Sequence, residues 1–298
     1  MATLLRVFAG EGDRLWLPAA IDTESLPELP GLPRPVLESG PLHQLPRADE
    51  VLAWCETPEA VAHRAGARDS APSLDAPLDE LLWKLPVAEP VVVAAVNHRN
   101  FQRWVADYIG CGLPGAQPVW SLTHLDRILR AGPRSWVVKA PLCAAGRDRY
   151  IERSGPTLSD PKARRTVERL FERHGTLFFE PWMDRTADFG VSALLTHSAL
   201  RIAGIHRQRV DRSGRFLAID LETSLSEEIR ARLAETTEAV AECLRLAGYV
   251  GPFGIDAWTY RQDDGSIALN PLGEINARMT FGLVAWTLAE RQPGSRLL

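Results

Sequence analysis

The stretches that decide the fold are Gly254-Ile-Asp-Ala-Trp-Thr-Tyr260 and Leu269-Asn-Pro-Leu-Gly-Glu-Ile-Asn-Ala-Arg278, on either side of Asp263-Asp264-Gly265. The intervening residues are of the types that form turns. The sequence therefore predicts two extended segments joined by a turn.

Alternate residues of an extended segment share a face. Glu274, Asn276 and Arg278 therefore point one way, and the turn brings Asp256 alongside Glu274. Carboxylate and amide oxygens suit a hard cation such as Mg²⁺, and a nearby arginine suits phosphoryl charge. The alternative is an exposed hairpin with a Glu274–Arg278 salt bridge, and spacing alone favours that alternative.

Asp256 in a Gly-Ile-Asp segment, followed by Glu274-Ile-Asn-Ala-Arg278, resembles the metal-binding end of the ATP-grasp enzymes. The resemblance implies an α+β fold in which two α+β subdomains hold ATP and Mg²⁺ between them, preceded by a small α/β domain. It implies that Asp256, Glu274 and Asn276 bind the metal. It also implies a catalytic Arg278 near the γ-phosphate and the substrate carboxylate.

Length and composition agree with such a protein. The chain has 298 residues, of which 45% are hydrophobic, and a formal net charge of −4. This is long enough for two or three small subdomains, and the mild acidity gives no support for nucleic-acid binding. No apolar run approaches a membrane span, and the start is not a signal peptide. Four scattered cysteines predict reduced thiols and a cytoplasmic protein.

Residues 1–92 are expected to form the small N-terminal domain, which resembles the α/β domain that often precedes an ATP-grasp core in layout only. Short strands are expected at Leu4–Ala9, Leu15–Ala19 and Val51–Cys55. A helix is expected to begin after Thr57, with threonine as the cap and proline at the first helical position.

Residues 93–175 are expected to form the first ATP-grasp subdomain. The apolar, β-branched run Pro90–Val96 predicts a buried strand, and the spacing of aromatic residues from Phe101 to Ile109 predicts a helix. By resemblance, Arg99 stands where relatives carry a phosphate-contacting lysine. Arg99 could equally be a plain residue of the first helical turn, and arginine is not equivalent to lysine as a point charge.

Lys139 is expected at the end of a strand over 135–141, followed by a loop over 142–149. This resembles the lysine-bearing strand and small-residue loop that fold over the ATP phosphates. Small residues let backbone N–H groups approach phosphate oxygens, and lysine supplies a compact positive charge. The loop has one glycine, Gly146, where relatives often have several.

Residues 177–183 predict a strand that resembles the hinge between the two ATP-holding subdomains. By resemblance, Glu180 and the backbone of Trp182 and Met183 hold adenine, and Asp188 binds the ribose hydroxyls. The alternative is an ordinary buried strand with a capping acid.

Residues 176–298 are expected to form the second ATP-grasp subdomain. Arg207 or Arg209 could contact phosphate or the substrate carboxylate, and a solvated strand face is at least as plausible. Periodicity predicts strands over 190–195, 200–210 and 216–221, and helices over 224–246 and 279–292.

The resemblance implies an ATP- and Mg²⁺-dependent ligase that joins a carboxylate to an amine or similar nucleophile through an acyl phosphate. Two alternatives stay open. One is a kinase of the same fold that phosphorylates a small molecule, and the other is a non-catalytic nucleotide-binding module that docks on partner proteins. The acceptor could be a small molecule or a peptide, and no nucleic acid or membrane partner is expected.

Overall fold

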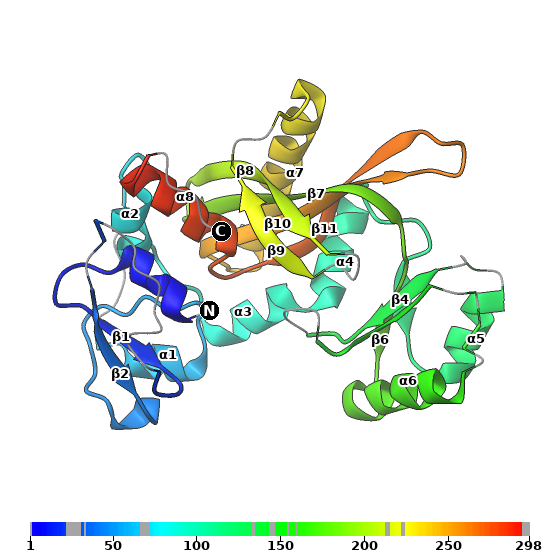
Figure 1. Cartoon of the computed structure of the whole chain (residues 1–298), viewed down its shortest axis with the longest axis horizontal. Helices are drawn as coiled ribbons and strands as arrows, with labels where there is room; N and C mark the ends of the chain where they lie inside the picture. The colour runs from blue at the N-terminus through cyan, green and yellow to red at the C-terminus, as the bar shows by residue number, and fades with distance from the viewer. Residues whose placement is uncertain are drawn as a thin grey trace.

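The computed structural model describes residues 2–21, 31–32, 34–65, 72–130, 132, 135–142, 147–153, 155, 157–158, 160–211, 215–221 and 224–293. Three sheets, of two, four and five strands, organise this part of the chain. Figure 1 shows the N-terminal segments and the four-stranded sheet at opposite ends of the long axis, with the five-stranded sheet between them. No helix among the described residues is long and apolar enough to cross a membrane.

The five-stranded sheet is antiparallel throughout, in the order β11-β10-β7-β8-β9. The expected hairpin is confirmed as its edge pair, and Gly265 takes a positive φ of 84° in the turn. The sheet consists of β7 (Asp184–Leu195), β8 (Leu200–Val210), β9 (Phe216–Asp220), β10 (Gly251–Arg261) and β11 (Ile267–Asn276).

Two helices cover this sheet, as the periodicity predicts. In α7 (Glu227–Leu246), the Ser226 hydroxyl caps the first turn by accepting from the Ile229 N–H. In α8 (Phe281–Arg291), the Thr280 hydroxyl accepts from the Leu283 N–H. The buried leucines and valines of α7 pack in one core with the inner faces of β7, β10 and β11.

The four-stranded sheet, in the order β3-β6-β4-β5, has its own core. It is entirely antiparallel and packs against α5 (Leu122–Arg130) and α6 (Pro161–His174). Gly175 ends α6 with a φ of 71°, a conformation that glycine adopts without steric cost. The strands are β3 (Gln117–Val119), β4 (Trp136–Lys139), β5 (Arg149–Glu152) and β6 (Leu177–Pro181).

The N-terminal segments follow the sequence prediction only in part. The strand expected at Leu4–Ala9 is wrong, because this segment forms a 3₁₀ helix, η1 (Ala2–Phe8). Its apolar side packs with α8 in a shared core. Val51–Cys55 is not a strand or a helix. The helix after Thr57 is confirmed, with the Thr57 hydroxyl accepting from the Ala60 N–H. The remaining elements are β1 (Arg14–Leu17), β2 (Val36–Ser39), η3 (Leu42–Gln44), α1 (Pro58–His63) and α2 (Leu78–Lys84).

The buried strand expected over Pro90–Val96 is also wrong, because these residues form the helix α3 (Pro90–Asn97). Pro90 fits the first helical position, where its missing N–H is not needed. Val93 and Val96, three residues apart, are buried, whereas Val91 is 75% exposed. A short β-branched run is compatible with either structure, and here one helical face fits the core. The next helix, α4 (Arg99–Tyr108), is confirmed, and its first residue Arg99 is buried.

Candidate active site

Asp256 on β10 and Glu274 on β11 are directly opposite each other in the antiparallel register, as the hairpin predicts. The register shifts between Asp256 and Trp258, so the hairpin is irregular immediately beyond this pair. Burial, and secondarily the charge of Glu274, raises the pKa of the Asp256 carboxyl to about 6. Two neighbouring, partly buried carboxylates that repel each other could be stabilised by a bound cation.

Gln208 holds Asp256 in place, a role that the sequence did not predict. The Gln208 amide Nε2 donates to Asp256 Oδ1 at 2.9 Å, although β8 and β10 are separated by β7. Gly190 of β7 lies between them, where an added Cβ would be 2.7 Å from Gln208 Nε2 and 2.3 Å from His206 Nε2. The glycine therefore leaves the space through which Gln208 reaches Asp256.

Asn276 is the last residue of β11, and Arg278 lies two residues beyond the end of the strand. The Asn276 Nδ2 donates to Asp256 Oδ2 at 3.1 Å, and Arg278 Nη2 donates to Asn276 Oδ1 at 2.5 Å. Arg278 Nη1 also donates to the Met279 carbonyl at 3.3 Å. Among the described residues, no carboxylate lies within salt-bridge distance of Arg278. The alternative Glu274–Arg278 salt bridge is therefore wrong, and Arg278 keeps a positive charge that an anionic ligand could neutralise.

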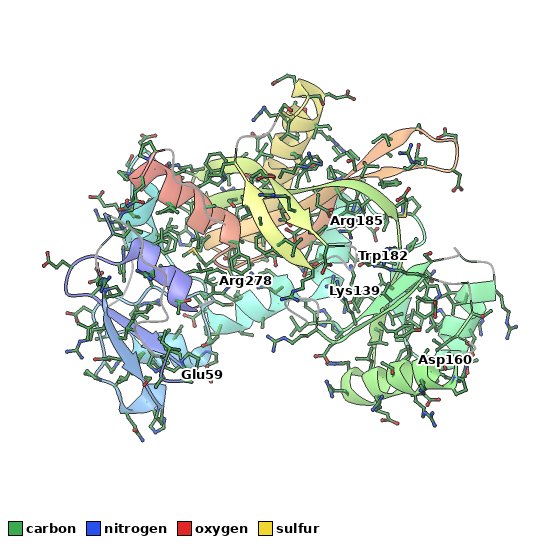
Figure 2. The ribbon with its side chains drawn as sticks, in the orientation of Figure 1. Glu59, Lys139, Asp160, Trp182, Arg185 and Arg278 are labelled. Atoms are coloured by element: carbon green, nitrogen blue, oxygen red, sulfur yellow. The ribbon has the colours of Figure 1, made fainter. Side chains whose placement is uncertain are left out.

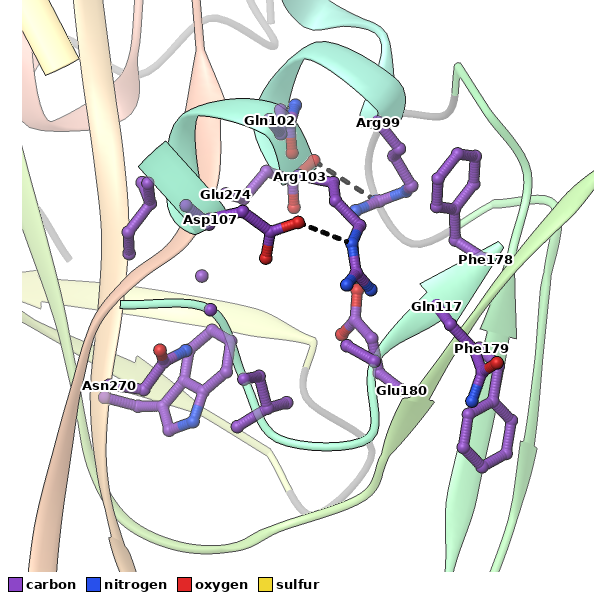
Figure 3. A pocket seen from close by; sticks show the side chains of 17 residues that line it. Arg99, Gln102, Arg103, Asp107, Gln117, Phe178, Phe179, Glu180, Asn270 and Glu274 are labelled. Atoms are coloured by element: carbon purple, nitrogen blue, oxygen red, sulfur yellow. Dashed lines mark hydrogen bonds and ion pairs between the residues drawn. The ribbon is translucent and has the colours of Figure 1, made fainter. Parts of the chain in front are cut away.

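Arg99 connects the hairpin to the four-stranded sheet. Its Nη2 lies 3.4 Å from Glu274 Oε1, its Nη1 lies 3.9 Å from Glu180 Oε1, and its Nε donates to the Ala140 carbonyl at 3.1 Å. Figure 3 shows Arg99 directed toward Glu274, with Glu180 below them. The Arg99 side chain is 7% exposed, so the contacts that hold it are largely shielded from solvent.

Lys139, on β4, donates to Glu180 Oε2 of the neighbouring strand β6 at 2.5 Å. Burial lowers the pKa of Lys139, and Glu180 partly offsets this shift. Burial by itself raises the pKa of Glu180, but Lys139 and Arg99 outweigh it and hold that pKa below its usual value. Arg99 of α4 and Lys139 of β4 are therefore joined in one charged network with Glu180 of β6 and Glu274 of β11.

The residues that the resemblance assigns to the hinge, Trp182 and Met183, directly follow β6. The Trp182 N–H donates to the Ser135 carbonyl at 2.9 Å, so a bound base would have to use other backbone groups. The Met183 carbonyl accepts from the Arg185 N–H at 3.0 Å. The side chain of Asp188 pairs with Arg185 Nη1 at 2.9 Å. Figure 2 shows Lys139, Trp182 and Arg185 close to one another, and Arg278 nearer the N-terminal segments.

Other residues that the sequence singled out lie apart from this network. Arg209 pairs with Asp220 at 3.1 Å on the outer strands, where it is 57% exposed, and Arg207 is also exposed. Both occupy the solvated strand face that the sequence offered as the alternative. Gly146 and the central residues of the loop over 142–149 lie outside the described residues.

A pocket extends from this network along the edge strand β11. Phe178 and Phe179 line one side, and Trp258 and Asn270 line the opposite side together with Leu272. Figure 3 shows Asn270 across the pocket from the two phenylalanines. Apolar walls with a few polar groups are typical of small-molecule sites. The full charged rim comprises Arg99, Arg103, Asp107, Glu180 and Glu274.

The residues present fit a divalent cation. Asp256 and Glu274 supply oxygen atoms from opposite positions of the hairpin, and a bound cation would offset the repulsion from Glu274 that contributes to the raised pKa of Asp256. The amide oxygen of Asn276, which accepts from Arg278 in this structure, would be a third donor if it exchanged that hydrogen bond for the cation. The described residues contain no cluster of three His, Cys, Asp or Glu side chains, so a softer metal of the zinc type has no site of that kind among them.

No family model matches the chain, and no curated protein matches it in sequence. Solved structures do match. D-alanyl-alanine synthetase A from Vibrio cholerae aligns with 70% of this chain and 63% of its own, at 16% identity and a TM-score of 0.52. Biotin carboxylase from Campylobacter jejuni aligns with 71% of this chain and 49% of its own, at 14% identity and a TM-score of 0.53.

A third structure, pyruvate carboxylase from Rhizobium etli, aligns with 68% of this chain and 17% of its own, at 17% identity and a TM-score of 0.52. In each case the match spans less than two thirds of the other protein. The synthetase and the biotin carboxylase have the ATP-grasp fold. The chain therefore has this fold as well, as the resemblance in the sequence implies.

His206, adjacent to this site on β8, should make folding stability depend on pH. It is 2% exposed, and burial lowers its pKa to about 4 from an ordinary value of 6.5. The unfolded chain therefore takes up a proton below pH 6.5 that the folded chain does not. The stability that the neutral histidine contributes is present above pH 6.5 and is lost as the pH falls toward 4.

Urea unfolding of the wild-type protein and of His206→Gln tests this expectation. When the pH is lowered from 7.5 to 5, the free energy of unfolding of the wild type should fall by about 2 kcal/mol more than that of the variant. This follows from the difference between the pKa of His206 in the folded and in the unfolded chain. Equal losses in the two proteins would show that His206 is accessible to protons in the folded state.

Proposed function

We propose that the protein is an ATP- and Mg²⁺-dependent ligase that activates a carboxylate as an acyl phosphate and joins it to an amine or similar nucleophile. One observation carries the proposal. The Asp256–Glu274 pair lies beside a network in which Arg99 contacts carboxylates of both sheets. Negative charge for a metal and positive charge for phosphates therefore lie side by side, as phosphoryl transfer requires.

Asp256, Glu274 and Asn276 would hold Mg²⁺, which when bound neutralises negative charge on the phosphate groups. Lys139 and Arg99 would exchange contacts with Glu180 for contacts with phosphate oxygens. These two cations differ in kind, because lysine is a compact point charge and arginine binds two oxygens with a planar group.

Arg278 would bind the substrate carboxylate, because its charge has no carboxylate partner among the described residues. A carboxylate oxygen held there takes the γ-phosphoryl group of ATP, giving ADP and an acyl phosphate. The amine then attacks the carbonyl carbon, loses a proton and releases phosphate. Positioning and charge stabilisation supply the catalysis, without a covalent bond to the protein.

The test has two stages. First, the melting temperature is measured with ATP, with ATP plus Mg²⁺ and with GTP, because a ligand of the native state raises it. A rise with ATP that grows with Mg²⁺ supports the nucleotide and metal assignments. ADP release is then measured with candidate acids and amines, alone and together.

A ligase should release little ADP until both the acid and the amine are present. ADP release with a hydroxyl compound alone, and a phosphorylated product, would instead identify a kinase. A melting temperature that no nucleotide changes would contradict the proposal and favour a docking module.

A further inference from the structure

The side chain of Arg185 lies between two tryptophans at the hinge. Its guanidinium carbon is 3.7 Å from the ring centroid of Trp258 on β10 and 5.7 Å from that of Trp182. Its Nη1 also pairs with Asp188 at 2.9 Å. One side chain therefore covers an aromatic ring and neutralises the carboxylate that the resemblance assigns to ribose.

Trp258 is confined on another side by the backbone. A Cβ added to Gly273 would be 1.7 Å from the Trp258 ring, so this contact exists only because position 273 is glycine. The indole is 4% exposed. With Gly273 packed against it and Arg185 over its face, Trp258 can present that face to a ligand only when Arg185 moves.

Two buried donors point to such a ligand. The indole Nε1 of Trp258 and the amide Nδ2 of Asn270 find no hydrogen-bond partner among the described residues. These two residues are directly opposite each other on β10 and β11, each is 4% exposed, and both line the pocket that contains Glu274 and Glu180. Buried donors are normally satisfied, so an acceptor-bearing ligand is expected here.

We propose that Arg185 is a displaceable cover of the nucleotide site and a determinant of its specificity. On binding, the planar base takes the place of the guanidinium on Trp258, and the ribose hydroxyls take its place on Asp188. The proposal rests on the proposed function and adds to it, because ligand entry then requires breaking the contacts of Arg185 with Trp258 and with Asp188. A ligand that supplies both a base and a ribose replaces both contacts, whereas a bare phosphate chain replaces neither.

The cover should lower the affinity for ATP. Only the molecules in which Arg185 has left Trp258 bind the base, and the apparent dissociation constant is the intrinsic value divided by that fraction. The attraction between a cation and an indole that is shielded from water is strong enough to raise the apparent dissociation constant for ATP about 10-fold.

Calorimetric titration of Arg185→Ala with ATP and with inorganic tripolyphosphate tests the proposal. We expect ATP to bind about 10-fold more tightly to Arg185→Ala than to the wild type, and tripolyphosphate to bind both proteins equally. Arg185→Lys keeps a charge near Asp188 but has no planar group. Its affinity for ATP should lie between those of the wild type and Arg185→Ala. The matched control is Arg261→Ala, which removes an exposed arginine 3.7 Å from Asp184 on the same pair of strands and should bind like the wild type.

The outcomes separate this proposal from the proposed function. ATP binding that is unchanged or weaker in Arg185→Ala, with normal binding by the wild type, would overturn the cover and leave the function standing. Binding by Arg185→Ala alone would support both. Absence of ATP binding by both proteins would overturn both together.

Discussion

Replacing Glu274 with alanine is expected to reduce ATP turnover about 1000-fold, which corresponds to about 4 kcal/mol of transition-state stabilisation. Glu274 lies opposite Asp256, and its Oε1 is 3.4 Å from Arg99. Its removal leaves a single carboxylate to hold the metal, and it also takes one partner from Arg99. ADP release under saturating substrates is the measurement.

The fold should survive this change. The Glu274 side chain is 30% exposed, and Arg99 retains its contact with Glu180, so the free energy of unfolding should change by about 1 kcal/mol or less. Asp263→Ala, which removes an exposed acid from the turn of the same hairpin, is the matched control and should keep full turnover. Normal turnover by a folded Glu274→Ala protein would show that the metal assignment is wrong.

Replacing Arg99 with methionine should both destabilise the protein and weaken ATP binding. Arg99 is buried, and its removal leaves Glu274 and Glu180 without the cation that joins them, at a cost of about 3 kcal/mol. Loss of a charge-assisted contact to phosphate should also lower ATP affinity about 30-fold. Urea unfolding measures the first effect, and calorimetric titration measures the second.

The chain offers a matched control one helical turn away. Arg103 on α4 pairs with Asp107 at 3.1 Å, but its side chain is 36% exposed and its partner 54%. Arg103→Met should therefore change the unfolding free energy by about 0.5 kcal/mol or less. If Arg103→Met and Arg99→Met had equal effects on stability and on ATP affinity, the central role of Arg99 would be contradicted.

Local patterns were enough to predict the hairpin and its opposed carboxylates. Period-two alternation fixes which residues share a face, and the turn fixes the pairing, so Asp256 and Glu274 are brought together by neighbouring chain. The cap of the helix after Thr57 is an equally local feature that the sequence predicted. Lys139, Glu180 and Arg99 were singled out only through the resemblance, and their contacts with one another were not predicted, because these residues are far apart in sequence.

Other features, including the helix over Pro90–Val96 and the contact between Gln208 and Asp256, depended on the tertiary structure. The run Pro90–Val96 forms a helix because one helical face of it packs into the core. Periodicity in so short a segment does not distinguish a buried helix from a buried strand. Gln208 reaches Asp256 because β7 lies between β8 and β10 and carries Gly190 at the crossing point. Sheet order depends on long-range packing and not on local residue patterns. The sequence by itself therefore determined the hairpin and its opposed carboxylates, and the tertiary structure determined which side chains hold them in place.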